Sequence, residues 1–235
     1  MTGSAARNRI WSLILRKNKQ VTLDSHQHFW KYSPAEHSWI SDDMRVIRRD
    51  FLPEDLEPVL MQNNVDGTVA VQADQSLEET QFLMDLAEKN PFIKAVVGWV
   101  DLQHPKVQEQ LDEFKTNPLF KGVRHIVQAE SDPEFMLRPA FLDGLEVLSQ
   151  NNLTYDILIY APQLPMAVEC VKKNPNLKFV IDHIAKPVIG QIPDEFWTRQ
   201  ISLLGEIPNV YCKISGMVTE ATANPDYSKF MDVVA

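Results

Sequence analysis

The stretch LTYDILIYAPQLPMAVECVKKNPNLKFVIDHIA (153–185) decides the fold. Two β-rich runs, LTYDILIY (153–160) and KFVIDHIA (178–185), enclose a segment at about 163–173 that has the pattern of an amphipathic helix. Several such runs in the chain are almost continuously apolar, as is typical of parallel strands that are buried on both faces. The stretch therefore predicts a strand–helix–strand unit with parallel strands.

The same alternation recurs along the chain. The other β-rich runs are VTLDSHQHF (21–29), VDGTVAVQA (65–73), IKAVVGWVD (93–101), KGVRHIVQA (121–129) and NVYCKISGM (209–217). Amphipathic helices are predicted at about 54–63, 76–89, 105–115, 134–150 and 194–206. Pro53 opens the first of these, and Ser76 with Glu79 predicts a capping box for the second.

Seven such units predict an α/β fold and, by their number, a (β/α)8 TIM barrel. A doubly wound open sheet is the alternative, but no G-x-G-x-x-G motif follows the first strand to favour it. A complete barrel takes about 250 residues, whereas only eighteen follow Met217 here. We therefore expect one domain over 21–235 that lacks the eighth βα unit, so that the chain is a fragment or an isoform, or its barrel is closed by another segment. Its first and seventh strands would then be open edges, which favours aggregation.

Composition excludes several classes of protein. The chain has 235 residues, 23 basic and 32 acidic, and a net charge of -9. No basic stripe is present for nucleic acid, and no apolar run reaches the roughly 20 residues of a membrane span. Two cysteines, Cys170 and Cys212, fit a reducing compartment. We expect a cytoplasmic protein, and because barrels commonly associate, a homo-oligomer is possible.

Residues 1–20 differ from the rest, with five basic residues and no acidic one. The run IWSLIL (10–15) is too short for a secretory signal. We expect a basic, disordered leader, with a mitochondrial presequence as the alternative.

Three histidines form a candidate metal site. His26 and His28 make an H-x-H pair at the end of the first predicted strand. Alternate residues of a strand point to the same side, so the pair directs two imidazoles into the mouth of a barrel. His183 ends the sixth predicted strand, across the same mouth. Such nitrogens hold a divalent metal at about 2.0–2.1 Å, and Zn²⁺ is the default ion for a histidine-rich site. For the pair taken alone, two solvated or core histidines are the alternative.

Five segments carry a resemblance to a known family. They are DSHQHFW (24–30), FLPEDL (51–56), GVRHIVQAE (122–130), VIDHIAKP (180–187) and YCKISGM (211–217). From about Val21 to the C-terminus the chain resembles the amidohydrolase superfamily, in its amidohydrolase-related branch of sugar-acid and dicarboxylate lactonases, which includes L-fuconolactonase-like and L-rhamnono-lactonase-like hydrolases.

The resemblance implies a metal-dependent TIM-barrel hydrolase that opens a small sugar-acid lactone. In that family the H-x-H histidines and the strand-six histidine line the catalytic centre. An aspartate that ends strand eight completes it, as metal ligand and general base, and this sequence stops before that aspartate. Members of the family differ in whether they need a metal, so the ion is dispensable in some of them.

Two cations are expected beside the histidines, and with His183 we predict them as catalytic. Arg124 ends the fourth predicted strand, where its planar guanidinium suits a carboxylate or vicinal hydroxyls; a structural ion pair is the alternative. Arg124 and His125 alternate, so only one points inward, and we favour Arg124. Lys213 interrupts an apolar strand and could bind an anionic group or the oxyanion. A gatekeeper lysine on an edge strand is the alternative.

Three further residues end strands and are candidates for substrate binding. Trp30 and Trp99 could stack on a sugar face, although packing at the rim also explains them. Gln72 could hydrogen-bond to a substrate hydroxyl. Asp156 lies inside the fifth strand and is expected to orient a neighbour, whereas His37 is expected at the surface.

Two hypotheses about function follow. The first is a cytosolic hydrolase that opens a sugar-acid lactone with water activated by a metal or a charged cluster; a related amidohydrolase or decarboxylase on the same barrel stays open. The second is a truncated, catalytically impaired chain that acts as a binding protein or has no function.

Overall fold

The computed structural model describes residues 20–189 and 195–221. The predicted leader over 1–20, apart from Gln20, lies outside the described residues. Within the described part no helix has both the length and the apolar character that crossing a membrane requires.

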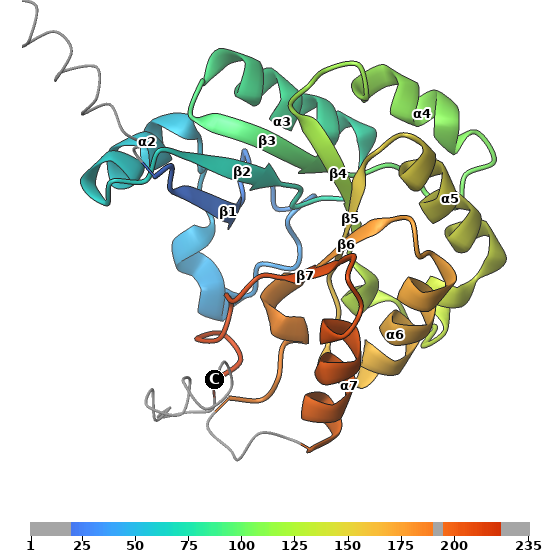
Figure 1. Ribbon diagram of the computed structural model, residues 1–235. Helices are drawn as coiled ribbons and strands as arrows, with labels where there is room; N and C mark the ends of the chain where they lie inside the picture. Colours follow the sequence, from blue (N-terminus) through green and yellow to red (C-terminus); the bar gives the residue numbers. More distant parts are fainter. Residues whose placement is uncertain (1–19, 190–194, 222–235) are drawn as a thin grey trace, which may run out of the picture.

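Seven parallel strands form one sheet that curls on itself (Figure 1), in the order of the chain. They are β1 (Leu23–Gln27), β2 (Gly67–Val71), β3 (Ile93–Gly98), β4 (Phe120–His125), β5 (Thr154–Ile157), β6 (Lys178–Ile181) and β7 (Val210–Cys212). Among the described residues β1 and β7 each pair on one side only, so they are the two edges of a partial barrel. The predicted TIM-barrel architecture, with seven of its eight strands in the described part of the chain, is confirmed.

Helices cover the outer face of the curled sheet (Figure 1). They are α2 (Pro53–Gln62), α3 (Leu77–Lys89), α4 (Val107–Phe114), α5 (Pro139–Gln150), α6 (Leu164–Lys173) and α7 (Glu195–Gly205). Short 3₁₀ turns are η1 (Asp42–Ile47), η2 (Val127–Ala129), η3 (Phe135–Leu137), η4 (Ala161–Gln163) and η5 (Asp182–Ala185).

One predicted helix, 134–150, is divided in two. Arg138 is extended, with φ -57° and ψ 133°, between η3 and α5. The ring of Pro139 disfavours helical geometry in the residue before it, and Pro139 then opens α5.

The hydrogen bonds at the starts of α2 and α3 match the predicted helix-start signals in part. The Asp55 carboxylate accepts a hydrogen bond from the Leu52 amide at 3.0 Å, and Pro53 is the first residue of α2. At α3 the Ser76 hydroxyl accepts from the Glu79 amide at 3.1 Å, as the capping box predicts. The Glu79 carboxylate, however, accepts from the Ala73 amide at 3.1 Å, so this helix start is tied to the end of β2.

The core lies between the sheet and the helices. Its largest fully buried side chains include Phe141 on α5, Tyr155 on β5 and Phe179 on β6. The ring of Tyr155 meets Phe141 edge-on at 5.7 Å and Phe179 edge-on at 6.3 Å. Burial of such rings holds the helices on the sheet, which leaves the carboxyl ends of the strands free to carry polar groups.

Candidate active site

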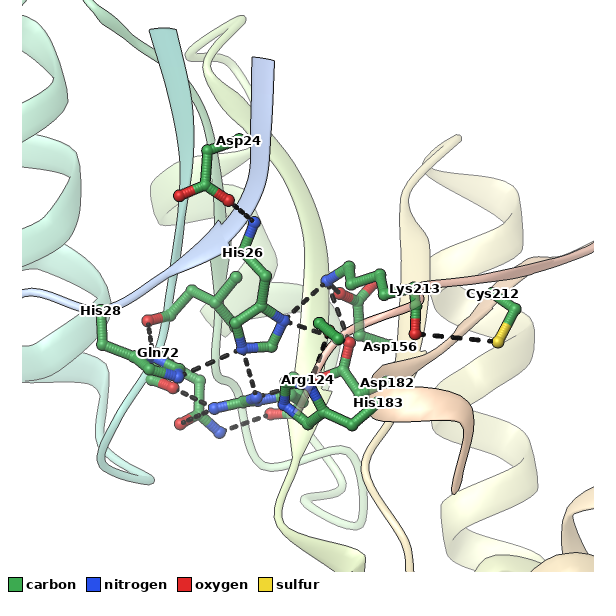
Figure 2. A network of polar contacts seen from close by, with 12 residues as sticks. Asp24, His26, His28, Gln72, Arg124, Asp156, Asp182, His183, Cys212 and Lys213 are labelled. Carbon is green, nitrogen blue, oxygen red and sulfur yellow. Dashed lines mark hydrogen bonds and ion pairs between the residues drawn. The ribbon is translucent and has the colours of Figure 1, made fainter. Parts of the chain in front are cut away.

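Polar side chains from β1, β4 and β5 and from the residues that follow β1, β6 and β7 converge at one point (Figure 2). They are His26, His28, Arg124, Asp156, Asp182, His183 and Lys213. In parallel α/β barrels the carboxyl ends of the strands meet at one mouth, which is where catalytic groups gather. The histidines, Arg124 and Lys213 that the sequence singled out are therefore brought together.

Hydrogen bonds orient the H-x-H pair. His28 Nδ1 lies 2.8 Å from the Val71 carbonyl. A carbonyl only accepts, so Nδ1 carries the proton and a neutral His28 turns the lone pair of Nε2 toward the site. That atom lies 3.1 Å from His26 Nε2. Two nitrogens bound tetrahedrally to one ion at about 2.0–2.1 Å are about 3.3 Å apart, so the spacing suits a shared metal.

His183 reaches the same point through an unusual turn. Residues His183, Ile184, Ala185 and Lys186 all have φ between 50° and 55°, the left-handed region. Each such non-glycine residue costs about 1–2 kcal/mol, and strain of this kind concentrates at functional sites. The turn places the His183 ring 4.5 Å from that of His26. His183 Nδ1 hydrogen-bonds to Ser215 Oγ at 2.9 Å, which leaves its Nε2 for other partners.

The donor atoms fit a divalent metal in type and spacing. Over the described ranges, His26, Asp182 and His183 offer ligand atoms within 4.8 Å of one another. Imidazole nitrogens and a carboxylate oxygen are common metal ligands. The guanidinium of Arg124 also lies nearby, with Nη1 3.3 Å from His26 Nε2.

Four buried charges surround His26 and balance one another. Asp182 pairs with Arg124 Nη1 at 3.0 Å and with Lys213 Nζ at 3.0 Å. Lys213 Nζ also lies 2.5 Å from the Asp156 carboxylate and 3.2 Å from His26 Nδ1. Buried charges are tolerated when each has a partner, so this cluster holds two cations at the site without excess charge.

Burial sets the protonation of the histidines. It lowers the pKa of His28 well below its ordinary value, and the charge of Arg124 adds to the effect. Burial, and then the neighbouring His26, lower the pKa of His183 to about 4. The pKa of His26 is lowered as well, again mainly by burial. All three imidazoles are therefore neutral at pH 7 and able to accept a proton or bind a metal.

The two aspartates are shifted in opposite directions. Burial raises the pKa of Asp156 to about 6, against the opposing charge of Lys213. Burial would also raise the pKa of Asp182, but its hydrogen bond to His26 and the charges of Lys213 and Arg124 hold that pKa well below its usual range. Asp182 is thus a permanent carboxylate at pH 7.

Arg124 and His125 take opposite sides of β4. Arg124 faces the site, where its Nη2 also donates to the Gln72 carbonyl. His125 stacks on Phe135 at 4.7 Å and hydrogen-bonds to Glu130 at 2.7 Å. Trp99 Nε1 donates to His125 Nδ1 at 3.3 Å. Trp99 therefore packs against the outward histidine and is not brought to the mouth.

The other two candidates for substrate binding, Gln72 and Trp30, donate side-chain hydrogen bonds to carbonyl groups of the protein itself. Gln72 is fully buried, and its amide donates to the Arg124 carbonyl at 3.2 Å, so it supports Arg124. Trp30 borders the mouth but is only 8% exposed, and its Nε1 donates to the Arg49 carbonyl at 2.9 Å.

A cavity of about 450 Å³ opens over the cluster. It is lined by His28, Trp30, Trp39, Ala73, Gln75, Arg124, Ile126, Gln128, Ala129, Leu158, His183 and Lys186. Its size suits a small molecule with a few polar groups.

Sequence reasoning gave no firm role to three polar residues of the site, Asp182, Ser215 and Asp156. Asp182 and His183 are consecutive, so a regular strand would send them to opposite faces; the left-handed turn brings both in. Ser215 carries no pattern of its own and matters only through His183. Asp156 did carry a signal, because a carboxylate inside a buried strand needs a partner.

Comparisons with known proteins agree with this architecture. The family model described as Amidohydrolase matches residues 23–234. The L-fucono-1,5-lactonase of Burkholderia ambifaria is 36% identical over 204 residues, which are 87% of this chain and 70% of the relative. The enzyme of the same name from Burkholderia multivorans is 37% identical over 207 residues, 86% of this chain and 70% of the relative.

A solved structure extends the likeness to three dimensions. An amidohydrolase from Burkholderia multivorans, crystallised with bound Zn, superposes with a TM-score of 0.87 at 34% identity and covers 91% of this chain and 78% of that one. Fold and sequence thus agree over most of the chain. The chain belongs to the amidohydrolase family and is an enzyme of the hydrolase class.

Proposed function

We propose that the chain hydrolyses a neutral sugar-acid lactone, such as L-fucono-1,5-lactone. The observation that carries the proposal is the convergence of three neutral imidazoles with Arg124 and Lys213 beneath a small-molecule cavity. The names of the two Burkholderia relatives support the substrate class.

The site has the groups that lactone opening requires. Water attacks the lactone carbonyl carbon, the ring carbon–oxygen bond breaks, and a proton passes to the departing ring oxygen, which yields a hydroxy acid. In a site without a metal, where the charged cluster activates the water, we assign His183 as the group that accepts and returns the proton, because it is neutral and has Nε2 available. Arg124 and Lys213 are assigned to the negative charge that develops on the carbonyl oxygen, which their positive charges stabilise while both stay paired with Asp182.

In the alternative, metal-dependent site the ion we propose is Zn²⁺, held by His26, His28 and His183, with His183 Nε2 as a ligand and not as the proton acceptor. The 3.1 Å separation of the first two Nε2 atoms supports this ligand set. When bound, a divalent ion polarises the carbonyl and lowers the pKa of a bound water.

Charge pairing in the cavity favours a neutral substrate over a dicarboxylate lactone. The Arg124 guanidinium is committed to Asp182, His26 and Gln72. The ammonium of Lys186 lies 3.9 Å from the Glu220 carboxylate. The cations that line the cavity in the described ranges therefore already have partners, whereas hydroxyl groups of a sugar lactone need no counter-charge.

Replacement of the histidines tests the assignment. We expect the chain to hydrolyse L-fucono-1,5-lactone, and His26→Ala and His183→Ala each to abolish turnover while circular dichroism shows an intact fold. His104→Ala is the control, because this histidine lies in the loop after β3 and its Nδ1 accepts from the Lys106 amide at 3.1 Å. Unchanged turnover in His26→Ala or His183→Ala would remove that residue from the mechanism, and a wild-type chain inert toward a panel of sugar lactones would refute the proposal.

A further inference from the structure

Trp39 is the large aromatic side chain that lines the cavity and is open to solvent. Trp39 is 48% exposed, whereas Trp30, which lines the same cavity, is 8% exposed. A half-exposed indole that lines a cavity offers a broad apolar face to a molecule bound there. Trp39 shares this cavity with His28, Arg124 and His183 of the candidate catalytic cluster.

The loop fixes Trp39 in this exposed position. Its neighbours His37 and Ile40 are buried, 5% and 3% exposed, so His37 is not the surface histidine that the sequence suggests. The His37 amide donates to the Ser33 carbonyl at 2.8 Å, and the Ile40 amide donates to the His37 carbonyl at 3.0 Å. Arg48 Nη2 donates to the Ile40 carbonyl at 2.9 Å. Because both sides of Trp39 are anchored, the indole is held in place before a ligand arrives.

The ring of Trp30 supports the indole from the side. The two rings meet edge-on, with centroids 6.3 Å apart and an interplanar angle of 79°. In an edge-on pair the edge of one ring meets one face of the other, so at least one face of the Trp39 indole stays available for stacking. Trp30, which the sequence suggested as a stacking residue, is therefore in the position of a support for Trp39.

Other loops contribute polar groups to the same cavity. Gln75 follows β2, Gln128 lies in η2 after β4, and Lys186 ends the left-handed turn after β6. A cavity with an aromatic surface and hydrogen-bonding groups suits a molecule that has both an apolar face and polar edges. A pyranose ring is such a molecule, because axial C–H bonds form one face and hydroxyl groups project from the edge.

We infer that Trp39 is a specificity-determining residue on which the ring of a pyranose-type lactone stacks. The inference rests on the proposed lactonase function and narrows it to six-membered, hydroxylated 1,5-lactones. Stacking acts on the bound ring alike before and during the reaction, so its loss weakens binding without slowing the chemical step.

Steady-state kinetics with L-fucono-1,5-lactone test the inference. We expect Trp39→Ala to raise KM about tenfold with kcat within about twofold of wild type, and Trp39→Phe to restore most of the loss. Phe196→Ala is the matched control, because Phe196 is 43% exposed on α7 and does not line the cavity. An unchanged KM in Trp39→Ala, or an equal change in Phe196→Ala, would overturn the inference.

A binding measurement separates this inference from the proposed function. L-Fucose is an unreactive pyranose of the expected shape, and its binding should quench indole fluorescence in the wild type but not in Trp39→Phe. Quenching that depends on Trp39 in a chain inert toward lactones would sustain the stacking site and defeat the lactonase assignment. Turnover of the lactone with neither a KM effect nor Trp39-dependent quenching would sustain the lactonase and defeat the stacking site.

Discussion

Glu79 is a carboxylate that the fold draws away from water at the start of α3. Burial raises its pKa from 4.5 to about 7, although the Ala73 amide donates to the charged form. A carboxyl group with a raised pKa binds its proton more tightly in the folded state than in the unfolded state. Its contribution to stability is therefore fully present below pH 4.5 and is lost as the pH rises through about 7.

Glu79→Gln should remove this pH dependence. The glutamine oxygen can still accept from Ala73, whereas the charge that is costly to bury disappears. Between pH 5 and pH 8 we expect the wild type to lose about 2 kcal/mol more unfolding free energy than the variant, as measured by urea denaturation. Glu78→Gln, at the exposed neighbouring position, is the control. Parallel stability curves for the wild type and Glu79→Gln would contradict the expectation.

Individual residues were predictable where the sequence itself showed a conflict. Lys213 stood out as a charge within an apolar strand and Arg124 as a charge at the end of one, and the structure places both beside His26. Trp39 and Ser215 lie in segments without such a conflict. Their positions depend on contacts with distant residues, which no local pattern records.

At the scale of elements, strands and helices follow from local rules but the left-handed turn does not. Pro53 and Pro139 open helices as their fixed φ requires. The turn after β6 is instead held from outside. The Ile184 amide donates to the Lys213 carbonyl at 3.1 Å, and Trp197 Nε1 donates to the Ile184 carbonyl at 2.8 Å. Tertiary contacts thus impose a geometry that these side chains avoid by themselves.

Gly216 is part of the support of this turn, and its replacement should displace His183. Gly216 has φ +70°, and an added Cβ would lie 3.0 Å from the Cβ, Cγ and Nδ1 atoms of His183. We expect Gly216→Ala to cost about 1–2 kcal/mol of unfolding free energy. Turnover of L-fucono-1,5-lactone should fall about tenfold or more, because displacement of a catalytic group is costly.

Gly205→Ala is the matched control for this variant. A Cβ at Gly205, the last residue of α7, would meet no atom within 4 Å. Both activity and stability should therefore stay at the wild-type level in Gly205→Ala. Full activity in Gly216→Ala would show that His183 tolerates the added methyl group, and it would contradict a role for Gly216 in positioning His183.

At the scale of the whole molecule, the number of βα units predicted the open, curled sheet. Its two edge strands expose apolar side chains, with Leu23 on β1 43% exposed and Tyr211 on β7 57% exposed. Unpaired strand edges that carry apolar side chains are templates for association between chains.

A lysine on the β7 edge should therefore slow aggregation of this chain. We expect Tyr211→Lys to lower the rate of light-scattering increase at 37 °C several-fold, because a charge on an edge opposes strand pairing between molecules. Val46→Lys adds the same charge in η1, at a position that is 77% exposed and belongs to neither edge strand. Equal protection by the two variants would trace the effect to net charge and not to the edge.

The contact between Lys213 and His26 has a consequence for how the protein is made. The two residues are 187 positions apart in the chain, yet Lys213 Nζ lies 3.2 Å from His26 Nδ1. Contacts of such sequence separation form late in folding, because the chain between them must first be ordered. A ribosome must release β7 from its exit tunnel before the centre that begins in β1 can assemble. Catalytic competence therefore arises only after β7 has been synthesised, and its appearance would time the docking of β7 in a translating system.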